Sequence, residues 1–287
     1  MLTSLSDTPA ALHLQVRIPQ RVYITLVGCG GTGSHIASGL ASIAGALAER
    51  DIKTDIYLVD PDIVEAKNVG RQLFSPSDIG QAKAAVLAHR LTTGFGLRVG
   101  GSVRAIDSLD TFLCEGRRGD HYDRQDALSI VIGAVDNPAA RSVIAAAVVN
   151  ANGRLWWLDA GNENHTGQVC IGNTAKTESM RHSVALGMID RLPAPHLVYP
   201  DLIKQAVKAK TKQSCAELTA AGEQGLMVNR MMAAWACTML DAFLVRGDLR
   251  YFAVAVDLAW GGVKAYTIDT PTIAAAIGLT EKQLTER

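Results

Sequence analysis

The sequence has few cysteines, and none of them are paired in a Cys-x-x-Cys motif. The five cysteines are widely separated, at Cys29, Cys114, Cys170, Cys215 and Cys237. This spacing opposes a disulfide-stapled scaffold and a four-thiolate zinc site, and we therefore expect no zinc. Scattered, unpaired thiols are typical of a protein that works in the reducing cytoplasm.

The chain also lacks an excess of charge and a long apolar run. Its 287 residues include 28 Lys or Arg and 28 Asp or Glu, so the formal net charge is zero. A broad basic surface for nucleic acid or for an anionic membrane is therefore not indicated. No uncharged apolar run reaches the roughly 18 residues of a membrane span. Residues 1–9 lack the basic and apolar blocks of a signal peptide.

Short β-rich runs alternate with helical patterns between residues 22 and 171. We expect strands at 22–27, 56–59, 97–106, 129–135, 155–159 and 167–171, and helices at 34–50, 81–92 and 139–152. Strand, helix and strand repeating in this order predict a doubly wound, mostly parallel sheet of the Rossmann-like α/β class.

The remaining segments are expected to complete the same domain. Residues 1–20 are predicted to form an extended arm, 21–172 the nucleotide-binding core, and 173–215 a crossover segment over the sheet. Residues 216–270 contain a predicted long helix and a closing β-hairpin, 251–268. Residues 271–287 are predicted to be a tail, loose over about the last dozen residues.

The long helix, predicted at 225–246, carries a stripe of large apolar side chains. They recur at four-residue spacing: Met227, Met231, Trp235, Met239 and Phe243. Such a stripe is typical of burial in the core, and a helix that is apolar on more than one side also favours contact with a second subunit.

A glycine loop follows the first strand and matches Gly-x-Gly-x-x-Gly at Gly28, Gly30 and Gly33. Glycines permit a tight turn and let backbone amides approach a phosphate at the positive helix end. Asp60 ends the second strand, where a carboxylate can accept hydrogen bonds from both ribose hydroxyls. A ligand-free turn would use the same residues, and a nucleotide here could be NAD or ATP.

Two cations and two amides after Asp60 favour a triphosphate over a dinucleotide. Arg71 can make a planar, bidentate clamp on phosphate, and Lys83 supplies a point charge. Asn68 and Gln72 offer neutral hydrogen bonds to phosphate or to an attacking carboxylate. Surface salt bridges are the competing explanation for the cations.

Asp136 follows another buried strand and so lies at the carboxyl edge of the sheet, where ligands bind. Its carboxylate could hold Mg²⁺ bound to phosphates. Because Asn137 and Pro138 come next, a helix N-cap is the alternative role for Asp136.

These motifs together resemble the ThiF/MoeB/HesA family, the ubiquitin-like-protein-activating enzymes and their bacterial relatives. The resemblance covers residues 20–172 well and continues more weakly through Cys215 and the helix after it. Among bacterial branches, the chain most resembles the ThiF-family proteins of the PRTRC gene system. The motifs that carry it are the loop at 28–34, Asp60-x-Asp62-x-Val64-Glu65-x-x-Asn68-x-x-Arg71-Gln72, Gly80-x-x-Lys83 and Asp136-Asn137.

The resemblance implies a homodimeric enzyme that binds MgATP. Its substrate would be a small ubiquitin-like (β-grasp) protein whose C-terminal glycine carboxylate attacks the α-phosphate. The resemblance leaves open whether a conjugating enzyme acts after this step. By motif position, Gly31 lies in the phosphate loop, Asp60 reads the ribose, Asn68, Arg71 and Lys83 contact phosphates, and Asp136 holds magnesium.

Two further roles are implied by position alone. Cys215, before the long helix, matches the place of a cysteine that accepts the activated carboxylate as a thioester, and Lys208, Lys210 and Lys212 upstream would lower its pKa. An inert cysteine is the alternative. Arg17 or Arg21 on the arm would reach the γ-phosphate of a partner subunit.

Two other functions compete with adenylation. An NAD-dependent oxidoreductase explains the glycines and Asp60 but leaves Asn68, Arg71 and Lys83 without a role. A scaffold that binds nucleotide without turnover would not need Asp136.

Overall fold

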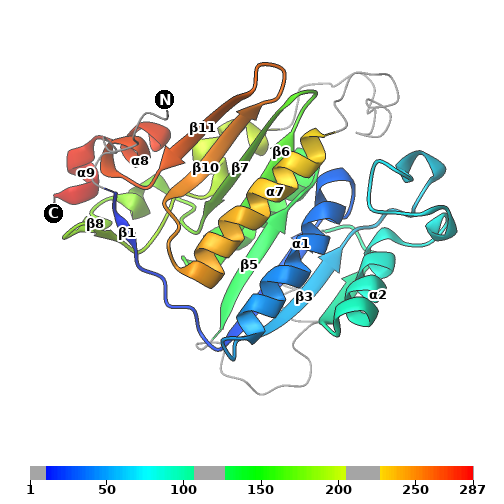
Figure 1. The fold of residues 1–287 in the computed structure, drawn as a ribbon. Helices are drawn as coiled ribbons and strands as arrows, with labels where there is room; N and C mark the ends of the chain where they lie inside the picture. The colour runs from blue at the N-terminus through cyan, green and yellow to red at the C-terminus, as the bar shows by residue number, and fades with distance from the viewer. Residues whose placement is uncertain (1–10, 107–126, 205–226, 287) are drawn as a thin grey trace, which may run out of the picture.

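The computed structural model describes residues 11–106, 127–204 and 227–286. They form one central sheet with helices on both faces (Figure 1). Cys114 and Cys215, with the lysines upstream of Cys215 that are predicted to lower its pKa, lie outside the described residues.

Within the described residues, the central sheet has eight strands in the order β11-β10-β7-β6-β5-β2-β3-β4. Strands β6, β5, β2, β3 and β4 run parallel, and β7, β10 and β11 extend the sheet in antiparallel fashion. The predicted doubly wound, mostly parallel sheet with a C-terminal β-hairpin is therefore confirmed. The strands are β2 (Arg21–Val27), β3 (Lys53–Val59), β4 (Arg98–Ser102), β5 (Leu128–Gly133), β6 (Leu155–Asn162), β7 (Thr166–Gly172), β10 (Tyr251–Asp257) and β11 (Gly262–Thr267).

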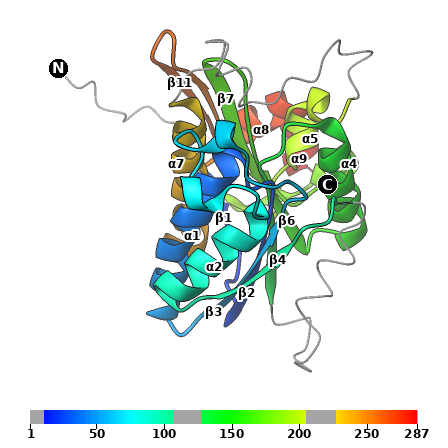
Figure 2. The same cartoon turned by 90° about the vertical axis from the view of Figure 1, so that its right-hand side faces the viewer.

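The helices divide between the two faces of the sheet. Helices α1 (Gly31–Ala48), α2 (Lys83–Phe95) and α7 (Val228–Leu240) cover one face, and α4 (Pro138–Ala151) and α5 (Pro195–Val198) lie on the other (Figure 2). The central strands are apolar almost throughout because both of their faces are covered. Each face has its own apolar cluster, and the one beneath α4 contains Val131, Ile144 and Trp157.

The apolar stripe of the long helix is only partly buried. Met239 and Phe243 are in the core, whereas Met227 and Met231 are 52% and 39% exposed. Four residues of α-helix turn the chain about 40° past a full circle, so a stripe at this spacing winds around the helix. The helix also changes character, because α7 ends at Leu240 and continues as a π-helical segment, η6 (Asp241–Arg246).

The predicted loose tail is wrong. The last residues form α8 (Thr270–Ile277) and α9 (Glu281–Thr285), and the side chain of Leu284 is fully buried. Asp269 caps α8 by accepting a hydrogen bond from the Thr272 amide. A capping residue followed by an apolar segment was the sequence signal for these helices.

The arm and the crossover segment meet at one side of the molecule. Strand β1 (His13–Leu14) pairs with β9 (Met188–Ile189), which pairs with β8 (Val184–Ala185). The described part of the crossover also contains the short turns η4 (Thr177–Met180) and η5 (Pro200–Leu202). None of the helices in the described ranges is long and apolar enough to cross a membrane.

Candidate active site

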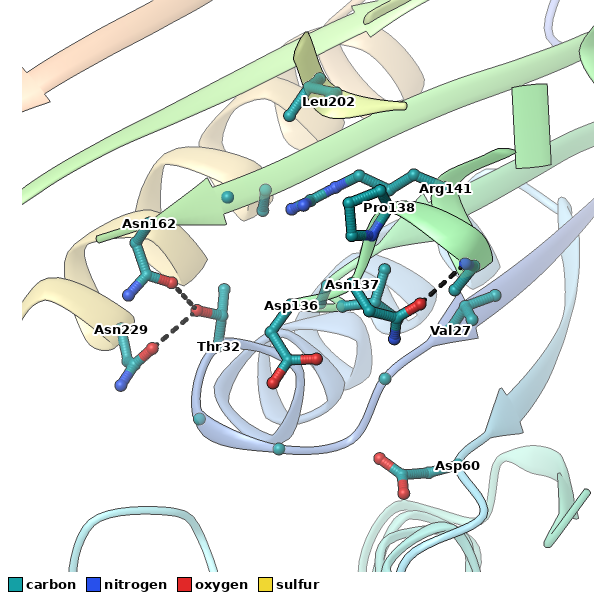
Figure 3. A pocket seen from close by; sticks show the side chains of 18 of the residues that line it. Val27, Thr32, Asp60, Asp136, Asn137, Pro138, Arg141, Asn162, Leu202 and Asn229 are labelled. Carbon is teal, nitrogen blue, oxygen red and sulfur yellow. Dashed lines mark hydrogen bonds between the residues drawn. The ribbon is translucent and has the colours of Figure 1, made fainter. Parts of the chain in front are cut away.

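A cavity of about 1070 Å³ opens at the carboxyl ends of β2, β3, β5 and β6. This edge is where ligands bind in doubly wound sheets. Figure 3 shows the centre of the cavity, with Thr32, Asp136 and Asp60 around it. Most of the residues predicted for the site line it: Gly28, Gly30, Gly31, Asp60, Asp62, Asn68, Gln72, Lys83, Asp136 and Asn137. Gly33 and Arg71 do not.

The glycine loop is packed too closely for side chains at two of its glycines. Gly28 has a φ of +91°, and a Cβ on it would lie 2.4 Å from the carbonyl oxygen of Ala134. A Cβ on Gly33 would lie 1.8 Å from the carbonyl oxygen of Gly28. At Gly30, by contrast, the nearest atom would be Gln72 Nε2 at 3.9 Å, so this part of the backbone is open to an approaching ligand.

The loop presents the start of α1 to the cavity. The helix begins at Gly31 with Gly30 as N-cap, no side chain accepts a hydrogen bond from its first-turn amides, and its first turn has no acidic residue. These free amides and the positive end of the helix dipole favour an anion. The loop therefore has the properties of a phosphate site.

Asp60 is buried beside the loop and is held by two backbone amides. Its Oδ2 accepts from Cys29 N at 2.6 Å and its Oδ1 accepts from Asp62 N at 2.8 Å. Burial raises the pKa of the Asp60 carboxyl above its ordinary value, while the two amides and the charge of Lys83 oppose that shift. Each carboxylate oxygen keeps a second lone pair for a ligand hydroxyl.

Lys83 is a buried cation at the start of α2. Its Nζ donates to Asp62 Oδ2 at 2.9 Å, and the two side chains differ sharply in exposure, 7% against 64%. Because Asp62 is largely in water, this ion pair is weakly held. A ligand phosphate could take the place of the Asp62 carboxylate on Lys83.

In the segment between Asp60 and α2, side chains hydrogen-bond the backbone of the same segment. Asn68 ends the turn η1 (Ala66–Asn68), and its Oδ1 accepts from Glu65 N at 2.8 Å. Asn68 is 2% exposed, so it supports the cavity wall as well as lining it. The Oε1 of Gln72 is buried and has no hydrogen-bond partner among the described residues.

Arg71 lies outside the cavity lining, next to α1. The backbone of Arg71 hydrogen-bonds His35, and Arg230 at the start of α7 is close enough for its charge to affect the same histidine. Burial lowers the pKa of His35, and Arg230 lowers it further. The contact between Arg71 and phosphate therefore stays a prediction.

Asp136 and Asn137 have separate roles. Asn137 is the N-cap of α4, where its Oδ1 accepts from Ala140 N at 2.8 Å. Asp136 is exposed, faces the middle of the cavity and makes no hydrogen bond or ion pair with the described residues (Figure 3). The alternative prediction of Asp136 as the N-cap is therefore wrong, because Asn137 caps α4, and the Asp136 carboxylate remains available to a ligand.

Sequence reasoning missed a hydrogen-bonded group at the back of the loop. The Thr32 hydroxyl lies 2.9 Å from Asn229 Oδ1 on α7 and 3.1 Å from Asn162 Oδ1 on β6 (Figure 3). A hydroxyl has one proton, so one of the two amides must turn its NH₂ toward Thr32. Asn162 at the end of β6 could have been found by the strand-end rule, whereas nothing near Asn229 in the sequence points to the loop.

A buried ion pair on the α4 side was also missed. Arg141 Nε donates to both carboxylate oxygens of Asp159 on β6, at 3.1 and 3.2 Å. Asp159 is 1% exposed, and burial raises the pKa of its carboxyl while the charge of Arg141 opposes the shift. The sequence signal was the spacing of Arg141 from the N-cap Asn137. Residues about one helical turn apart lie on the same side of a helix, so Arg141 is expected to face the strand ends as Asn137 does.

Comparison with known proteins identifies the family. The profile of the ThiF family matches residues 12–256, most of the chain, and the chain belongs to this family. No curated protein sequence gives a significant match.

Solved structures show the same fold at low identity. PaaA has a TM-score of 0.57 and 14% identity, with 88% of this chain and 74% of PaaA covered. MccB of E. coli with ATP has a TM-score of 0.53 and 19% identity, covering 86% and 63%. The microcin C7 biosynthetic enzyme MccB with N-formylated MccA has a TM-score of 0.54 and 17% identity, covering 86% and 64%. The chain thus spans just under two thirds of MccB.

Substitutions at two glycines of α1 test whether the close packing of the loop contributes to the stability of the protein. Gly33→Ala should lower the free energy of unfolding by about 1–3 kcal/mol, because the new methyl overlaps backbone. Gly45→Ala is the matched control, since nothing lies within 4 Å of its Cβ position; it should stabilise the helix by roughly 0.5–1 kcal/mol. Urea unfolding of both variants gives the values. Equal effects of the same sign would contradict the packing argument.

Proposed function

We propose that this protein is an ATP-dependent adenylating enzyme. In the proposed reaction, a carboxylate oxygen at the C-terminus of a small protein or peptide attacks the α-phosphorus of ATP. The bond from the α-phosphorus to the bridging oxygen breaks, pyrophosphate leaves, and an acyl-adenylate forms. The observation that carries this proposal is the convergence of three groups on one cavity: the uncapped amides of α1, the buried Asp60 and the unpartnered carboxylate of Asp136.

Each group has a physical task in this reaction. The amides at Gly31 and Thr32 would bind phosphate oxygens, and Asp60 would accept hydrogen bonds from the ribose with its remaining lone pairs. Lys83 would bind phosphate in place of Asp62 and stabilise charge that develops on the leaving group. Asn68, Arg71 and Gln72 are proposed as further phosphate contacts on the strength of their motif.

The residues present fit a magnesium ion that arrives with the nucleotide. The described residues contain no group of three or more His, Cys, Asp or Glu that could hold a metal by themselves. Mg²⁺ does not need one, because it is usually bound by one or two carboxylates together with substrate phosphates. Asp136 is the carboxylate that would hold it, and the ion would supply neutralisation of phosphate charge.

The competing functions fit the geometry less well. A dinucleotide would use the glycine loop and Asp60 but would give no task to the unpartnered Asp136 or to a Lys83 held by an exposed acid. A non-catalytic scaffold would gain nothing from leaving a carboxylate unpaired in the cavity. Binding of NADH without any response to ATP would favour the oxidoreductase.

The proposed substrate is a small ubiquitin-like protein that ends in glycine, with a conjugating enzyme as a possible later partner. Motif resemblance to the PRTRC branch of the family supports this choice. MccB structures contain the peptide MccA or its derivatives, so a short peptide is the alternative within the same reaction.

Asp136→Asn tests the catalytic proposal. The variant should fold normally, because the side chain is exposed, and should lose ATP–pyrophosphate exchange by about 10²–10³-fold. Exchange is measured with MgATP and a panel of small β-grasp proteins ending in Gly and of peptides with free C-termini. Asp190→Asn, which changes an exposed surface pair with Arg191, is the control and should keep its rate. Equal rates for the two variants would remove Asp136 from the mechanism.

A homodimer is the expected oligomeric state. The exposed Met227 and Met231 at the start of α7 support a second subunit covering that part of the helix. Arg21 pairs with Asp55 at 2.9 Å, which leaves Arg17 as the better arm residue to reach across. Sedimentation equilibrium should give twice the chain mass at micromolar concentration, and Met231→Glu should shift it toward monomer. A wild-type monomer would contradict the dimer and the arm contact together.

Cys215 is proposed as the acceptor of the activated carboxylate. Because the carboxylate itself attacks phosphorus, Cys215→Ala should retain pyrophosphate exchange but form no thiol-sensitive adduct with the small protein. A non-reducing gel with mass spectrometry after incubation with ATP and substrate detects the adduct. Cys237→Ala is the control, since burial raises the pKa of that thiol to about 11. An adduct that persists without Cys215 would make it a structural residue.

A further inference from the structure

Arg141 is held in a way that leaves most of its hydrogen-bond donors unused. A buried arginine that serves only as half of an ion pair commonly faces its carboxylate as a fork, with two parallel N–H donors. Here a single donor, Nε, sits between both oxygens of Asp159, and Nη1 and Nη2 make no hydrogen bond with the described residues. Arg141 lines the cavity, extending past Pro138 along its wall (Figure 3).

A second unused donor lies close to these nitrogens. A Cβ on Gly161 would be 3.0 Å from Arg141 Nη2 and 2.8 Å from Gln168 Nε2, so the two side chains flank the same point of β6. Gln168 on β7 also lines the cavity, and its side chain makes no hydrogen bond with the described residues, whereas its backbone pairs within the sheet. Two neighbouring N–H donors, one of them charged, match the two oxygens of a carboxylate.

This pair of donors is adjacent to the phosphate-binding loop. Asn162, the residue after Gly161, contacts the Thr32 hydroxyl in the first turn of α1 at 3.1 Å. A carboxylate held at Gly161 would therefore lie beside the helix start at which the triphosphate is proposed to bind. Because both ligands are anions, a fixed positive donor between them offsets their repulsion.

We infer that Arg141 and Gln168 form the subsite that binds the C-terminal carboxylate of the substrate. The inference rests on the proposed adenylation and adds the residues that select a free carboxylate over an amide. Asp159 acts as a positioning residue, because its pairing through Nε aims the two Nη groups at the cavity. When one carboxylate oxygen attacks phosphorus, the other becomes the carbonyl oxygen of the acyl-adenylate and can remain on the same donors.

The test measures binding of small probes to the full-length protein. The probes are glycylglycine and glycylglycinamide, observed by saturation-transfer NMR with and without the ATP analogue AMPCPP, whose own affinity is measured by calorimetry. Glycylglycine should bind at least about tenfold more tightly than its amide, because the amide cannot accept the charge-assisted hydrogen bonds that a carboxylate accepts.

Two variants separate the subsite from a structural role. Arg141→Lys keeps a charge for Asp159 but loses the Nη donors, and Gln168→Met loses the amide without touching any ion pair. Each should weaken glycylglycine about tenfold and leave AMPCPP affinity within about twofold. Arg154→Lys, in the exposed turn after α4, is the control and should change neither affinity.

The outcomes distinguish the two proposals. Equal binding of acid and amide, or unchanged glycylglycine affinity in both variants, would overturn the carboxylate subsite, as would wild-type protein that binds AMPCPP but no glycylglycine. Wild-type protein that binds glycylglycine through Arg141 but does not bind AMPCPP would leave the subsite standing and contradict adenylation instead.

Discussion

The close approach between the glycine loop and the strand ends is the constraint on which the rest of the site depends. Gly28 touches the backbone at Ala134, and Gly33 touches Gly28, with no room for a side chain at either glycine. This contact sets the start of α1 directly above the sheet edge, where its first-turn amides face the cavity. It also brings Cys29 N onto the Asp60 carboxylate, so one turn positions both the proposed phosphate site and the proposed ribose acceptor.

The cavity wall contains two ion pairs whose cation is buried, and the acid is exposed in one pair and buried in the other. Lys83 and Arg141 are buried cations, and each is already paired with an acid, Asp62 and Asp159 respectively. Burying an unpaired charge is costly, and the paired acid offsets that cost for each cation. The pairs differ in a useful way. Asp62 is exposed and can yield its place on Lys83 to a ligand, whereas Asp159 is fully buried and can only hold Arg141 in place.

Much of the site followed from local sequence because strand ends and glycine turns have local signals. Short sequence patterns, with the rule that ligands bind at carboxyl edges, were enough to predict the parallel sheet, the loop, Asp60 and Asp136. Residues that depend on distant packing had no such signal. Asn229 reaches Thr32 only because α7 lies beside α1. Arg71, whose backbone hydrogen-bonds His35, does not line the cavity. The loose tail was wrong although Asp269 offered a local capping signal, because burial of Leu284 depends on elements far away in the chain.

The charge balance of the cavity shows why directional donors matter more than net charge here. With both buried cations already paired, the walls have little surplus positive charge to attract a triphosphate and a carboxylate together. Amides at the start of α1, the Nη groups of Arg141 and the magnesium ion proposed at Asp136 could each bind an anion without adding a buried, unpaired charge to the protein. The affinity of such a site depends on geometry, which the glycine contacts and the pairing of Arg141 with Asp159 provide.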